Sequence, residues 1–187
     1  MTISAEATPP RVKARAIGVV YLFYFLTAIS DEVLVGRGRL HVFDAVHLIA
    51  CAFYIAVTLL FYYMFRPVNR NLSLLTAIFG LVGCANDVLG IFNLAPYKIS
   101  SLAFFGPYCL LISYLIFRST FLPRFLGVLM ALAGVGWLIV LSPLASPLSP
   151  YLEILGFVAE ASLMLWLIVK GVNIPRWKEQ ANAATVE

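Results

Sequence analysis

The sequence predicts an all-α membrane protein: a polytopic bundle of six transmembrane helices with both termini in the cytoplasm. Three observations support this fold class. First, 62% of the 187 residues are hydrophobic and only 12% are charged, whereas soluble domains are about half apolar and about a quarter charged. Second, the apolar residues form runs of about twenty, the length that crosses a hydrocarbon core about 30 Å thick. Third, lysine and arginine gather on one side of these runs.

Short breaks divide the apolar sequence into six predicted spans. They cover residues 16–35, 42–65, 71–94, 100–118, 122–142 and 150–170. Glycine, proline or charged residues interrupt the chain between them, at 36–39, 66–71, 96–98, 119–124 and 143–150. Because every connection is short, neighbouring helices are expected to be antiparallel.

The first span follows Arg11, Lys13 and Arg15, a pattern that also begins secretory signal peptides. Residues 28–30 would pass as a cleavage site for a signal peptidase. Because five further spans follow, we expect a retained first anchor.

The distribution of basic residues predicts the orientation. Ten of the 13 lysines and arginines lie on the side of both termini, and three lie on the other side. The positive-inside rule therefore places the tails 1–15 and 171–187 in the cytoplasm. The basic residues lie at span ends, so their charge does not indicate nucleic-acid binding. We expect the lipid bilayer as a partner, and a membrane-protein partner or a second copy of the chain stays open.

Polar residues follow helical spacing within several spans, and six acids fall in the predicted outer half or at the outer surface. Ionisable groups at membrane depth usually face protein or water. The sequence therefore predicts an outward-opening polar pocket made of Glu160, Asp87, Asp44, His47, His41 and Asp31. The alternative is structural, with these groups satisfying one another and holding the bundle together.

The sequence assigns no metal ligand, cofactor or catalytic residue. His41, Asp44 and His47 carry ligand types that zinc accepts, but positions six apart on a helix lie about 240° apart in azimuth. The three cysteines fall inside apolar runs without a metal-binding or disulfide spacing. No serine or cysteine stands beside a histidine in a pattern typical of nucleophilic catalysis.

Three function hypotheses follow. The first is a non-enzymatic membrane protein that interacts with a partner or with lipid. The second is a small proton- or ion-coupled transporter that uses Glu160 and Asp87. The third is a membrane-embedded metal-dependent hydrolase that uses the histidines of the second span.

Three stretches resemble a known bacterial family of multi-pass membrane proteins, domain-of-unknown-function family 4386. They are RPVNRNL at 66–72, LIFRSTFLPRFLGVL at 115–129 and AEASLMLWLIVKGVN at 159–173. The resemblance extends over residues 14–177 and implies about six helices in a bacterial inner membrane, with no established activity. Glu160 falls where the family motif carries a glutamate, whereas the first connection, at 36–40, is shorter than the family's.

Overall fold

The computed structural model describes residues 10–36, 40–94, 99–142 and 147–184; among these, the side chains of 10–13, 31–36 and 40–43 are outside the description. The described residues form seven helices and no strand, which confirms the all-α fold class. The helices are α1 (Pro10–Gly36), α2 (Leu40–Phe65), α3 (Arg70–Ile91), α4 (Leu102–Arg118), α5 (Arg124–Val140), α6 (Ser149–Val169) and α7 (Ile174–Ala183).

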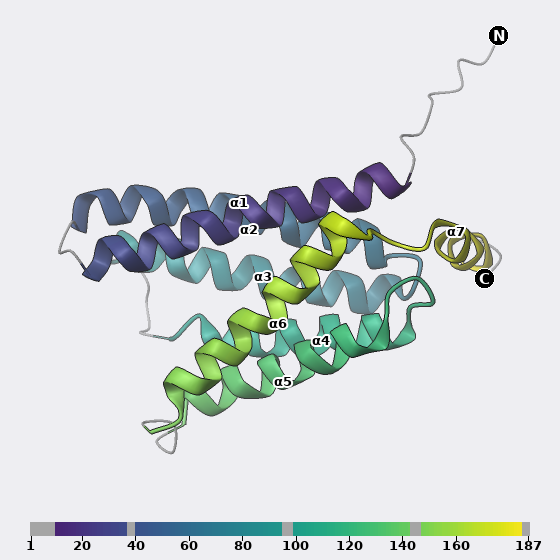
Figure 1. Cartoon of the computed structure of the whole chain (residues 1–187). Helices are drawn as coiled ribbons and strands as arrows, with labels where there is room; N and C mark the ends of the chain where they lie inside the picture. The colour runs from purple at the N-terminus through teal and green to yellow at the C-terminus, as the bar shows by residue number, and fades with distance from the viewer. Residues whose placement is uncertain (1–9, 37–39, 95–98, 143–146, 185–187) are drawn as a thin grey trace, which may run out of the picture.

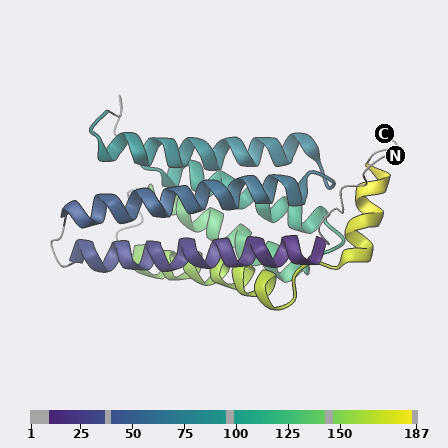
Figure 2. The same cartoon turned by 90° about the horizontal axis from the view of Figure 1, so that it is seen from above.

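The first six helices form a closed ring. Each packs mainly against its neighbours in sequence, and α6 returns to pack against α1. Figures 1 and 2 show the six helices running roughly side by side, with α6 crossing α1 and α5 obliquely. The arrangement is the helix bundle that the short connections predict.

Three described helical segments are long and apolar enough to cross a membrane by length and composition: Asp44–Phe65, Arg70–Ile91 and Ser149–Val169. Three shorter apolar segments lie beside them, Ala14–Ser30, Leu102–Arg118 and Arg124–Val140. Large apolar side chains on the outside of the ring are exposed, such as Phe23, Leu132 and Leu165. An apolar exterior of this kind is typical of helices in contact with lipid.

The interior of the ring is packed with aromatic and aliphatic side chains. Four helices contribute fully buried side chains that include Tyr21, Phe61, Tyr108, Ile112 and Leu163. Tyr54 joins this core through its ring contact with Tyr108, at 5.6 Å between ring centroids. The polar groups described below therefore lie next to this packed core.

The observed helix ends differ from the predicted span ends by a few residues, and the differences have local causes. α1 starts at Pro10 rather than at residue 16, since proline is well suited to the first turn of a helix. α3 ends at Ile91 rather than at 94, because Asn93 adopts a left-handed conformation with φ 55°. α4 runs through Pro107 without interruption.

The helix α7 has no counterpart among the predicted spans and lies within the predicted tail. Lys170 and Gly171 both donate their N–H groups to the Trp166 carbonyl, and Gly171 has φ 69°, a conformation that favours glycine. The chain turns there, and α7 then lies crosswise at the end of the bundle where α1 begins (Figure 2).

Hydrogen bonds hold α7 to this end of the bundle. The Trp177 indole N–H donates to the Met64 carbonyl at 3.1 Å, and the Gln180 amide donates to the Arg118 carbonyl at 3.2 Å. Thr120 donates both its N–H and its hydroxyl to the Gln180 side-chain oxygen, at 3.2 and 3.3 Å. α7 therefore joins the ends of α2 and α4.

Glycines allow two pairs of helices to approach closely. A Cβ atom added to Gly18 would lie 2.8 Å from the backbone nitrogen of Ile168, so α1 and α6 touch through their backbones. On α5, Gly134 would bring a Cβ to 2.8 Å from the Gly106 carbonyl oxygen of α4. Small residues at membrane helix interfaces allow this kind of approach.

We expect Gly18→Ala to destabilise the bundle, because the clashing atom belongs to the backbone of α6 and cannot rotate away. Overpacking of this kind costs about 1–3 kcal/mol. Unfolding of the purified protein in mixed micelles measures the loss. Gly90→Ala is the matched control, since a Cβ at Gly90 meets nothing within 4 Å; equal losses in both variants would contradict the close contact.

Candidate functional site

Glu160 lies at the junction of α6 and α1, where the Tyr21 hydroxyl donates a hydrogen bond of 2.7 Å to its carboxylate. The Tyr21 side chain is only 1% exposed, and Glu160 is half-buried. Ala159 and Leu163, which flank it on α6, are fully buried. The deep acid predicted from the sequence therefore faces the interior of the ring and has a protein partner.

Tyrosine rings continue from this hydrogen bond across the core. Tyr24 lies next to Tyr21, and its ring centroid is 4.8 Å from that of Tyr54. Tyr108 follows, and its hydroxyl oxygen and that of Thr58 are buried without a hydrogen-bond partner among the described residues. The core thus contains several hydroxyl groups along one line of aromatic side chains.

A second polar group lies between α2 and α3. His47 and Cys51 are one turn apart on α2, and Asp87 faces them from α3. One nitrogen, sulfur or oxygen atom from each side chain lies within 4.8 Å of the others. Cys51 is buried, whereas His47 and Asp87 are half-buried.

The carboxylate of Asp87 is held by the segment that begins α4. The Ser101 hydroxyl donates to Asp87 Oδ1. The Asn86 amide in turn donates to the Ser101 hydroxyl oxygen at 3.0 Å and to the Ile99 carbonyl at 2.9 Å. Asn86 and Ser101 therefore orient one oxygen of Asp87.

Three of the six residues of the predicted pocket fall in two described polar groups. Glu160 pairs with Tyr21, whereas Asp87 and His47 lie together with Cys51. Tyr24 lies within electrostatic reach of both acids. Asp44 is half-buried, and the side chains of His41 and Asp31 lie outside the described residues.

Sequence reasoning missed the participation of Cys51 and of Cys84, whose thiol interacts with that of Cys51. The available signal was a pair of spacings. His47 and Cys51 are four residues apart, and Cys84 and Asp87 are three apart, so each pair occupies one helix face. The spacings do not show that this face of α2 packs against this face of α3.

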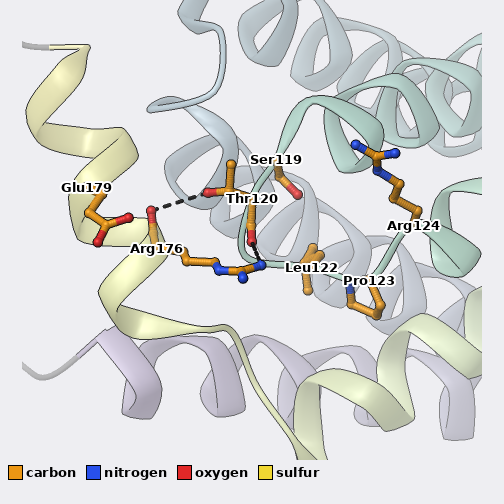
Figure 3. Close-up of a pocket in the computed structure, with 7 residues that line it drawn as sticks. All are labelled: Ser119, Thr120, Leu122, Pro123, Arg124, Arg176 and Glu179. Carbon is orange, nitrogen blue, oxygen red and sulfur yellow. Dashed lines mark hydrogen bonds between the residues drawn. The ribbon is translucent and has the colours of Figure 1, made fainter.

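A separate hollow of about 440 Å³ lies at the α7 end of the bundle. Its lining comes from the connection between α4 and α5, from the start of α5 and from α7: Ser119, Thr120, Leu122, Pro123, Arg124, Arg176 and Glu179. Figure 3 shows Arg176 directed toward this connection, where its guanidinium donates to the Thr120 carbonyl at 3.4 Å.

The fold and these polar groups define a helical membrane-type bundle, and the comparisons with known proteins place it in a family. The chain belongs to the family described as Domain of unknown function (DUF4386), which matches residues 97–171. An uncharacterized protein from Archaeoglobus fulgidus is 32% identical over 131 residues, covering 63% of this chain and 76% of that protein. No solved structure matches the chain.

The family match confirms the resemblance predicted from the sequence. Its 97–171 range contains Glu160, Ser101 and the connection between α4 and α5. It does not include Tyr21, the group formed by His47, Cys51 and Asp87, or α7. The family description assigns no activity to any of these residues.

We expect Tyr21→Phe to destabilise the bundle by about 1 kcal/mol, because the Glu160 carboxylate loses its buried hydrogen-bond donor. Glu160→Gln retains an oxygen that accepts from Tyr21 and is expected to cost less. Unfolding in mixed micelles measures both effects. Tyr114→Phe provides the control, since Tyr114 is 49% exposed; a Tyr21→Phe variant as stable as the control would show that the hydrogen bond contributes nothing.

Proposed function

We propose that this protein is a non-enzymatic, six-span protein of the cytoplasmic membrane that binds the headgroup of an anionic phospholipid beside α7. The observation that carries the proposal is the hollow lined by Arg124 and Arg176. It lies at the bundle end where the sequence places most of the basic residues. The proposal is the lipid-interacting form of the first function hypothesis.

Six spans are consistent with the lengths of the helices. α4 and α5 contain 17 residues each, about 25 Å at about 1.5 Å per residue. This is the lower end of the range for transmembrane helices. Their packing against the longer α3 and α6 makes it unfavourable for them to lie outside the bilayer while their neighbours cross it.

Charge supports a negatively charged ligand at this end of the bundle. Arg118 and Arg124 flank the connection that lines the hollow, Arg176 and Lys178 lie on α7, and Lys170 follows the end of α6 shortly before α7. Each basic residue near a membrane surface attracts anionic lipid by about 1 kcal/mol. Arginine also suits phosphate, because its planar guanidinium can donate two parallel hydrogen bonds.

The hollow also has a defined shape that a general basic surface would lack. Two hydrogen bonds fix one wall: the Thr120 N–H donates to the Gln180 side-chain oxygen on α7, and the Gln180 amide donates to the Arg118 carbonyl. Leu122 and Pro123 supply apolar surface beside the two arginines. Glu179 lines the same hollow and opposes an anion. We therefore expect the charges of Arg124, Arg176 and Glu179 to affect the binding of an anion in the hollow.

The transport and hydrolase hypotheses have less support from the geometry. Tyr21 gives Glu160 a hydrogen-bond partner, so a structural role accounts for this acid without a transported ion. His47 lies in a polar group with Asp87 and Cys51, and the side chain of His41 lies outside the described residues.

The proposed topology predicts that both termini are cytoplasmic. Reporter fusions before residue 10 and after residue 184 would both be active only with a cytoplasmic reporter, because an even number of spans returns the chain to its starting side. A periplasmic or external signal at one terminus would contradict the six-span arrangement.

Arg124→Gln and Arg176→Gln are each expected to weaken the binding of phosphatidylglycerol by about fivefold, the equivalent of about 1 kcal/mol. Glu179→Gln is expected to strengthen it, because a repelling carboxylate is removed. Native mass spectrometry of the detergent-solubilised protein measures the occupancy, with phosphatidylcholine as the zwitterionic comparison.

Arg70→Gln is the matched control, because Arg70 begins α3 at the same end of the bundle but does not line the hollow. Equal weakening by Arg70→Gln and Arg176→Gln would indicate general surface charge and contradict a defined site. Displacement of the lipid by glycerol phosphate at equal concentration would identify a soluble phosphate ester as the ligand and overturn the lipid assignment.

A further inference from the structure

We propose that His47, Cys51 and Asp87 form a binding site for a divalent transition-metal ion such as zinc, between α2 and α3. Imidazole, thiolate and carboxylate are the ligand types that zinc accepts in proteins. The inference goes beyond the proposed lipid-binding function, because it concerns the opposite half of the bundle and different residues.

The ligand geometry follows from helical spacing. His47 and Cys51 are four residues apart, so both lie on the face of α2 that meets α3, and Asp87 lies across from them. Sites in helix bundles are built in the same way, from ligands on facing helices. With zinc bonds of about 2.0–2.3 Å, tetrahedral ligand atoms are about 3.5 Å apart. The observed limit of 4.8 Å leaves an adjustment of at most about 1.3 Å, within the reach of side-chain rotation.

Charge favours a divalent ion over a monovalent one. When the ion binds, the Cys51 S–H bond breaks, the sulfur bonds to the metal and the proton leaves to the solvent. A thiolate, a carboxylate and a neutral imidazole carry two negative charges together, which a divalent cation neutralises. A neutral site is the least costly at a position surrounded by apolar helices.

The neighbours of these residues already resemble the surroundings of metal ligands. Ligating carboxylates are commonly fixed by further hydrogen bonds, and Ser101 donates to Asp87 while Asn86 holds Ser101. Cys84 interacts with Cys51. Kept as a neutral thiol, Cys84 can donate to the Cys51 thiolate without adding charge. The fourth position on the metal is then left for water.

The proposed site lies toward the end of the bundle opposite α7, and an ion would enter from that end. His47 is seven residues into α2, about 10 Å along the helix at about 1.5 Å per residue. His47 and Asp87 are both half-buried rather than fully enclosed. In the proposed topology, this end faces the outside of the cell.

The test is a titration of the full-length protein in detergent with Co²⁺ under reducing conditions. We expect one equivalent to bind and to produce the near-ultraviolet absorption of a thiolate bonded to cobalt, and Zn²⁺ to displace it. Cys51→Ser is expected to abolish this absorption. His47→Ala and Asp87→Asn are each expected to weaken binding at least about tenfold.

Cys109→Ser is the matched control, because Cys109 is fully buried on α4 and lies outside this group. Circular dichroism checks that each variant retains its helices. The proposal is overturned if the wild-type protein binds no stoichiometric Co²⁺ or Zn²⁺, or if a folded Cys51→Ser variant retains the thiolate absorption. Lipid binding is measured separately, so failure of one proposal leaves the other intact.

Discussion

A carboxyl group inside a bilayer has to meet another protein group, because the hydrocarbon offers it neither water nor counterion. In this chain α1 supplies that group to α6, through the Tyr21 hydroxyl and Glu160. The same pair of helices makes the backbone contact at Gly18. Every other major helix pairing joins neighbours in sequence. The α1–α6 contact therefore converts a series of hairpins into a ring, and the interior that holds the polar groups exists only because the ring is closed.

The sequence predicted the helices well because an apolar run is a property of one segment. The limits of α6 fall within one residue of the predicted span, since prolines precede it and Gly171 follows it. α7 escaped prediction for the opposite reason. Residues 174–183 carry charges and no apolar run, and the helix is held by Trp177 and Gln180 through hydrogen bonds to distant carbonyl groups. Such a helix depends on contacts that a local pattern does not contain.

The polar groups show the same difference between what a local sequence pattern predicts and what depends on contacts between helices. Cys51, Tyr54 and Thr58 share one face of α2 with His47, and the first three are buried in the structure. Spacing alone could not decide which faces meet. It grouped Glu160 with the other acids, whereas its described partner is a tyrosine on α1. It related His47 to His41 on the same helix, whereas the neighbouring ligand types are Cys51, one turn away, and Asp87, on another helix. Each difference concerns the rotation of one helix relative to the next.

The ring also has a consequence for the synthesis of the protein. A membrane protein is made from its N-terminus, and helices that pair with their sequence neighbours can associate as they emerge. Here the contact between α1 and α6 cannot form early. Tyr21 has no hydrogen bond to Glu160 until α6, the last helix of the ring, has been translated. Until then the contact between α1 and α6 is missing, and the ring stays open. A chain that ends before α6 would lack the α1–α6 contact, and this missing contact is a feature that cellular quality control would be able to detect.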